Sequence, residues 1–119
     1  MKPEILAPAG DEDALRAAVR AGADAVYFGV KGHNARARAK NFDVDELPRV
    51  MAELHRWGVK GYVTLNTLTF DHELDAVEAV VRACADAAVD AVIVQDLGVV
   101  QLCRAVAPGL EVHASTQMT

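Results

Sequence analysis

The sequence predicts a parallel α/β fold. Five short apolar segments, typical of buried strands, alternate with four segments in which apolar residues recur at helical spacing. A strict strand–helix order makes consecutive strands parallel, because each helix carries the chain back to the edge of the sheet where the strands begin. The residues alone do not decide between two arrangements of the sheet, a doubly wound five-stranded sheet or half of a TIM-like (β/α)8 barrel.

The expected strands are short and rich in alanine and valine. The fourth is almost wholly apolar, as a strand covered on both faces should be. The turn Pro8-Ala9-Gly10 closes the first strand. The predicted ranges are Glu4–Ala7, Ala25–Phe28, Val59–Leu65, Ala91–Val94 and Glu111–Ala114.

The first helix carries Leu15, Ala18 and Val19 as a one-faced apolar stripe, and Gly22 ends it. Later helices are expected over about residues 72–87 and 97–107.

The start of the second helix is ambiguous. Asp43 and Glu46 have the spacing of a capping box, but that start would put Pro48 inside the helix, where its ring removes a backbone bond. A start at Asp45 places Pro48 in the first turn, where the missing N–H costs nothing. We therefore expect the helix to begin at Asp45.

A quasi-repeat supports this order. Arg16–Gly29 and Arg82–Gln95 align without gaps and share six of fourteen residues, including the Asp-Ala-Val that opens each strand. Gly58 matches Gly22 as a helix-ending glycine in a third copy. Each unit is predicted to be a helix, a tight stop and a buried parallel strand.

Composition excludes several classes of protein. Hydrophobic residues make up 52% of the chain and charged residues 24%, which is ordinary for a globular domain. The net charge of −5 argues against a surface that is basic throughout. No apolar run approaches the roughly 18 residues of a membrane span, and no signal peptide is recognisable, so we expect a cytoplasmic protein. Cys84 and Cys103 fall on apolar helix faces and are predicted to be core residues, not metal ligands.

Polar side chains follow the ends of the predicted strands, which meet at one rim of a parallel fold. Asn66, Asp96 and Ser115 could instead cap the helices that follow them. The loop over residues 31–40 holds four basic residues and no acid, and it could bind an anion such as a carboxylate or phosphate, or be a solvated loop. The candidate substrate-binding residues are Asn34, Arg36, Arg38, Asn66, Gln95 and Gln117.

His113 and Ser115 alternate on the last strand and so share a face. A serine–histidine pair suggests hydrolysis, but a triad also needs an orienting acid and an oxyanion site. Asp96, after the preceding strand, is the candidate acid. His113, Asp96 and Ser115 are therefore the candidate catalytic residues.

Six ordered motifs resemble the N-terminal part of the collagenase-like peptidases, family 32 of the unassigned peptidases. The motifs cover essentially the whole chain: Leu6–Gly10, Gly22–Gly29, Asn34–Ala39, Tyr62–Thr67, Val94–Gly98 and His113–Gln117. The resemblance implies a β/α barrel, so that residues 1–119 would form the N-terminal half of a catalytic domain with no internal boundary. Unpaired edges of a half barrel favour self-association, so we expect a homo-oligomer.

The resemblance implies two competing activities. One is peptidase activity; the other, which we favour, is oxygen-independent hydroxylation of an RNA base or the ubiquinone ring. Several relatives of the second kind use prephenate as oxygen source, and many bind a four-iron four-sulfur cluster through four cysteines. Cys84 and Cys103 do not match those cysteines, so we expect no cluster in this chain. A dicarboxylate such as prephenate would suit Arg36 and Arg38. A third possibility is a non-catalytic assembly module.

Overall fold

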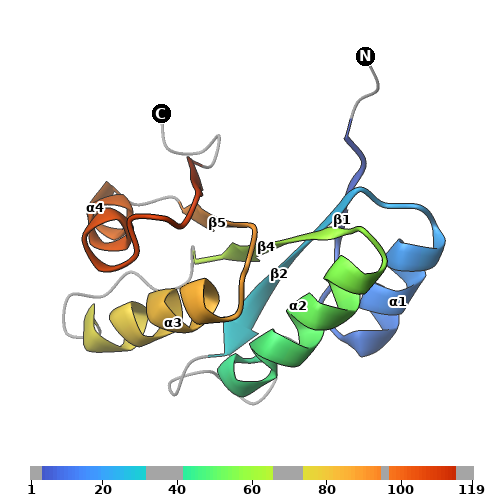
Figure 1. The fold of residues 1–119 in the computed structure, drawn as a ribbon, viewed down its shortest axis with the longest axis horizontal. Coiled ribbons are helices and arrows are strands. Elements are labelled where there is room, and N and C mark those ends of the chain that lie inside the picture. Colours follow the sequence, from blue (N-terminus) through green and yellow to red (C-terminus); the bar gives the residue numbers. More distant parts are fainter. Residues whose placement is uncertain (1–3, 32–41, 66–73, 95–96, 115–119) are drawn as a thin grey trace.

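The fold is a single parallel sheet with helices along one side (Figure 1). It was obtained as a computed structural model that describes residues 4–31, 42–65, 74–94 and 97–114. The main strands pair in chain order, β1-β2-β4-β5-β6, and every pair is parallel. Their bounds are β1 (Leu6–Pro8), β2 (Ala25–Lys31), β4 (Lys60–Thr64), β5 (Ala91–Val94) and β6 (Val112–Ala114).

Four α-helices follow the strands, and the described part of each packs on the same face of the sheet. They are α1 (Glu12–Arg20), α2 (Leu47–Arg56), α3 (Leu74–Asp86) and α4 (Leu97–Val106). The main apolar core joins helix residues to one alternating set of strand residues, whereas the small cluster on the other face contains strand residues alone. A doubly wound sheet carries helices on both faces and reverses its strand order. Sequential order with one-sided helices is instead about half of a (β/α)8 barrel, as expected.

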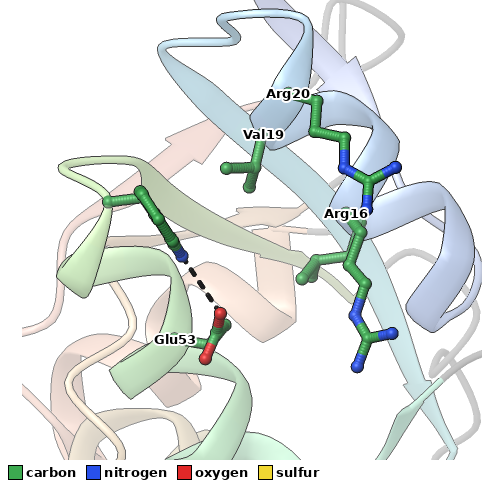
Figure 2. Close-up of a pocket in the computed structure, with 6 residues that line it drawn as sticks. Arg16, Val19, Arg20 and Glu53 are labelled. Atoms are coloured by element: carbon green, nitrogen blue, oxygen red, sulfur yellow. Dashed lines mark hydrogen bonds between the residues drawn. The ribbon is translucent and has the colours of Figure 1, made fainter.

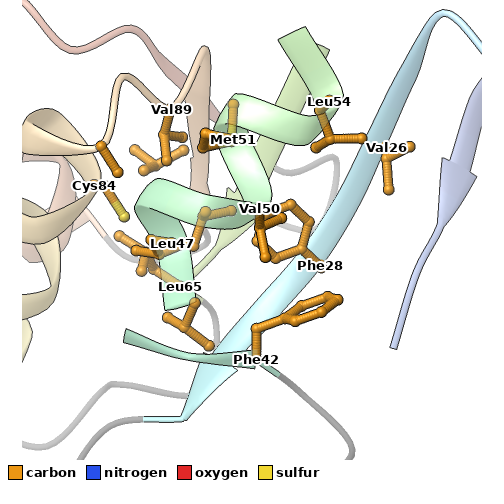
Figure 3. Packing of buried hydrophobic residues seen from close by; sticks show 14 of the residues in the cluster. Val26, Phe28, Phe42, Leu47, Val50, Met51, Leu54, Leu65, Cys84 and Val89 are labelled. Carbon is orange, nitrogen blue, oxygen red and sulfur yellow. The ribbon is translucent and has the colours of Figure 1, made fainter. Parts of the chain in front are cut away.

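The core between sheet and helices is closely packed (Figure 3). Val26 and Phe28 of β2 face α2, whose Leu47 and Leu54 are fully buried. These positions follow from period two in the strand and from the i, i+3, i+4 stripe in the helix. Phe42 packs edge to face on Phe28, with ring centroids 5.3 Å apart.

Phe42 belongs to an element that the sequence did not predict. The two-residue strand β3 (Phe42–Asp43) pairs in parallel with the end of β2, and the 3-10 turn η1 (Val44–Glu46) follows it. The α-helix α2 therefore begins at Leu47, two residues after the expected Asp45. Pro48 lies in the first turn, as predicted, so its missing N–H leaves no backbone bond unmade.

Both cysteines are buried and free, as predicted. Cys84 lies in α3 and Cys103 in α4, and neither side chain reaches solvent. Desolvation, together with the nearby Cys103 thiol, raises the pKa of the Cys84 thiol to about 12. Burial also raises the pKa of Cys103. Both sulfurs are therefore protonated packing groups near neutral pH, not thiolate ligands.

The quasi-repeat has a structural counterpart at the strand entries. Asp24 precedes β2, and its carboxylate accepts a hydrogen bond at 2.7 Å from the backbone N–H of Ile5. Asp90, the matching residue before β5, accepts one at 2.8 Å from the N–H of Gly61. Each aspartate thus ties the start of its strand to the neighbouring strand. Gly22 adopts φ +85°, and the predicted helix stop is confirmed there.

No helix in the described part of the chain is both long and apolar enough to cross a membrane.

Candidate functional site

The face of the sheet without helices carries a mixed aromatic and polar surface, here called the inner face. Strand residues alternate between the two faces, so Tyr27, Tyr62, Ile93 and His113 share this one. In a β/α barrel such a face lines the interior, next to the carboxyl ends of the strands where catalytic groups are found. The inner face is therefore the part of the structure that bears most directly on function.

Tyr62 lies at the centre of the inner face, and two small neighbours make room for its ring. Ala25 and Ala91, from the strands on either side, are buried against it. Its phenol donates a long hydrogen bond of 3.4 Å to Glu4. Desolvation raises the pKa of Tyr62, and the carboxylates of Glu4, Glu111 and Asp90 raise it further. The phenol is consequently a neutral donor at neutral pH.

His113 projects from β6 onto the same face. Its ring meets that of Tyr62 edge to face, with centroids 5.4 Å apart. Its Nε2 contacts the carboxylate of Glu111, two residues earlier on the same side of the strand. The side chain is 40% exposed, so the ring is oriented by two neighbours and still open to a ligand. An imidazole held in this way can transfer a proton through its other nitrogen.

Charged groups cluster at the entry of the strands on the inner face. Lys60 Nζ lies 3.9 Å from Glu4 Oε2, and Glu111 sits beside His113. All of these side chains are partly exposed, so the ion pairs contribute little stability. They place polar atoms at the end of the sheet opposite the predicted rim.

The structure locates one of the nine residues predicted for the site. His113 lies on the inner face. The others fall outside the described residues, in segments that follow the ends of β2, β4, β5 and β6 in the sequence. They stay predictions: Asp96, Ser115, Asn34, Arg36, Arg38, Asn66, Gln95 and Gln117.

Sequence reasoning missed the immediate partners of His113. Glu111 was taken only as the first residue of a strand, and Tyr62 only as part of a motif. The signal for Glu111 was present, since residues two apart on a strand share a face. The contact with Tyr62 depends on how β4, β5 and β6 pair, which the sequence did not predict in detail.

A metal or iron–sulfur site has no support among the described residues. They contain no group of three or more His, Cys, Asp or Glu side chains placed to hold a metal ion. Cys84 and Cys103 are buried on the helix side of the sheet, away from the inner face. The donor atoms that the structure describes therefore do not fit an iron–sulfur cluster.

Comparison with known proteins agrees with the motifs. Residues 10–119 match the sequence profile of peptidase family U32. The chain belongs to peptidase family U32. Its U32 relatives include the tRNA hydroxylation protein P1 of Bacillus subtilis, 41% identical over 99% of the chain, and a collagenase of Porphyromonas gingivalis, 40% identical over 97%. The 23S rRNA 5-hydroxycytidine C2501 synthase of Escherichia coli is 41% identical over 96% of the chain.

A solved structure has the same fold as this chain. The chain superimposes on a solved U32 peptidase, Mk0906, with a TM-score of 0.73 over 98% of its residues, at 16% identity, and covers 50% of that protein. It spans only 28% of the length of the B. subtilis and P. gingivalis relatives, and 17% of the E. coli synthase.

Proposed function

We propose that the full-length protein is an oxygen-independent hydroxylase of an RNA base, to which this chain contributes part of the barrel wall. The observation that carries this proposal is the set of relatives named for tRNA hydroxylation and for rRNA hydroxycytidine synthesis, which align with 96–99% of the chain. An RNA substrate also favours a cytoplasmic location.

The inner face suits such a reaction. His113, oriented by Glu111 and Tyr62, is a candidate to move a proton as the base is modified. Arg36 and Arg38 are proposed to hold a dicarboxylate oxygen donor such as prephenate, because guanidinium groups bind carboxylates in a bidentate manner. Any iron–sulfur cluster of the full-length protein would take its ligands from other residues than Cys84 and Cys103.

Peptidase activity is the second candidate. It is favoured by the P. gingivalis relative named collagenase. In that case Ser115 would be the nucleophile, His113 its base and Asp96 the orienting acid. The contact that the structure shows for His113 Nε2 is with Glu111, so Glu111 is an alternative orienting acid for this reaction.

The two activities are separated by assaying the full-length protein in parallel. Expressed in a bacterium that lacks its own tRNA and rRNA hydroxylases, it should restore hydroxylated nucleosides, measured by mass spectrometry of digested RNA. Arg36→Ala with Arg38→Ala should reduce them, and added prephenate should protect the wild-type protein against thermal unfolding but not this variant. Cleavage of gelatin that Ser115→Ala abolishes, without any hydroxylated nucleoside, would support the peptidase instead.

A further inference from the structure

The outer, helical surface carries a hollow that is not part of the inner face. It lies between α1 and α2, has a volume of about 350 Å³, and is separated from the inner face by the sheet and its core (Figure 2). A hollow of this size is within the range of small-ligand sites. Its lining is mainly apolar and comprises Leu15, Arg16, Val19, Arg20, Glu53 and Trp57.

One wall of the hollow is the indole of Trp57, which is 59% exposed. Its Nε1 donates a hydrogen bond of 3.0 Å to Glu53, which fixes the ring's orientation. The guanidinium of Arg56 lies 5.7 Å from the ring centroid, in the range of a cation–π contact. A large aromatic ring held in place and left open to solvent is a stacking platform.

The opposite wall is basic. Arg16 and Arg20 lie on α1, on the other side of the hollow from Glu53 of α2 (Figure 2). They are one helical turn apart, on the order of 6 Å along the axis. Arg16 makes a long ion pair of 3.7 Å with Glu12, while Arg20 forms no ion pair with the described residues. In a chain of net charge −5, the hollow thus has two arginines on one wall and a third behind Trp57.

We propose that this hollow binds single-stranded RNA, with one base stacked on Trp57 beside Val19 and the neighbouring phosphates on Arg16 and Arg20. The lining holds two arginines and one glutamate, Glu53, so its excess positive charge favours an anionic partner. The apolar floor and aromatic wall favour a flat, stackable group between the charges. A row of cations beside an aromatic platform is how proteins bind single strands. An acidic peptide would match the charges but leave the platform without a function. The inference rests on the proposed RNA substrate and adds a contact remote from the inner face.

Trp57 is the chain's only tryptophan, so its fluorescence reports on the hollow directly. Titration with oligoadenylate should quench that fluorescence to saturation, and binding should weaken as salt rises. Replacing both arginines, Arg16→Ala and Arg20→Ala, should lower the salt slope, d log K/d log[salt], by about 1.4 in magnitude, at about 0.7 per phosphate contact. Trp57→Ala should weaken the binding of labelled oligoadenylate about tenfold, whereas Trp57→Phe, which keeps a stacking ring, should restore most of it.

The matched control is Arg82→Ala with Arg104→Ala, which removes the same charge from α3 and α4. Arg82, like Arg16, is exposed and pairs with a glutamate four residues earlier, and this variant should bind as the wild type does. The inference is overturned if oligoadenylate does not quench Trp57, if both double variants bind alike, or if oligoglutamate quenches and competes equally well. Since this assay involves no hydroxylation, its failure leaves the proposed function standing. Absence of hydroxylated nucleosides would in turn refute that function without affecting the binding result.

Discussion

Tyr62 of β4 and His113 of β6 touch edge to face across the intervening strand β5, with ring centroids 5.4 Å apart and an angle of 70° between the rings. The contact is possible because β5 presents the small side chain of Ala91 beside Tyr62. The pair links three strands on a face that no described helix covers. It also gives the imidazole a fixed orientation, which a proton-transferring group requires.

Two substitutions of His113 separate packing from chemistry. His113→Phe keeps the edge-to-face contact, and His113→Ala removes it, which should cost about 0.5–1.5 kcal/mol of unfolding free energy. If the imidazole transfers a proton, both variants of the full-length protein lose the hydroxylated nucleosides alike. Activity retained in His113→Phe and lost in His113→Ala would assign the residue to packing alone.

Gly61→Ala should destabilise the fold. A Cβ at this position would lie 2.5 Å from Sδ of Met51 and 3.0 Å from Cδ1 of Leu54, both in side chains that are fully buried. Overpacking of this kind costs about 1–3 kcal/mol, measured by urea unfolding. Met51→Ala removes the side chain that the new Cβ would meet. The double variant should therefore lose less unfolding free energy than the sum of the losses in the two single variants. Gly109→Ala, where a Cβ meets nothing within 4 Å, is the control and should leave stability unchanged.

Stability should fall between pH 9 and 10. Burial raises the pKa of Cys84 from 9.0 to about 12, and that of Cys103 also rises, so the folded chain retains protons that the unfolded chain loses. The stabilisation from Cys84 is complete below pH 9 and declines as pH rises toward 12, by about 1 kcal/mol over the first unit, and Cys103 changes stability in the same direction. Urea unfolding at pH 8, 9 and 10 checks this. Cys84→Ala should show a shallower decline, and equal declines in both proteins would contradict the assignment.

The 119-residue chain should self-associate. Within the described residues, β1 and β6 are each paired on one side only, and Ile5 and Leu6 at the β1 edge are 49% and 45% exposed. Open apolar edges favour pairing with another chain. Light scattering at micromolar concentration should give a mass above 12.7 kDa, and Leu6→Lys should lower it. Trp57→Lys, on the outer surface, should not. A monomeric wild type would refute the expectation.

Much of the fold was predictable because local signals agreed with one another. Gly22 and Gly58 both end helices with positive φ, at the positions that the quasi-repeat aligned. In α2, Leu47, Val50, Met51 and Leu54 recur at helical spacing in the sequence, and the structure buries all four. The strand β3 was not predictable, because two residues carry no periodicity and their pairing with β2 depends on tertiary structure. The choice between half barrel and doubly wound sheet required knowing that the helices share one face.

The site was less predictable than the fold. Alternation placed His113 on a face shared with other strand residues, but it did not identify which strands would bring partners to it. Tyr62 is 51 residues away in sequence and reaches His113 only because Ala91 lies between them. The hollow beside Trp57 was not predictable from the sequence for a related reason, since it forms where two separate helices meet.

The proposed RNA hydroxylation is tested by the nucleoside composition of RNA exposed to the full-length protein. Total RNA from cells that lack their own hydroxylases is digested and analysed by mass spectrometry, with and without the protein. A nucleoside heavier by one oxygen atom is expected with the wild-type protein, and none is expected with His113→Phe that has folded normally. RNA of unchanged composition, together with gelatin cleavage by the same preparation, would contradict it.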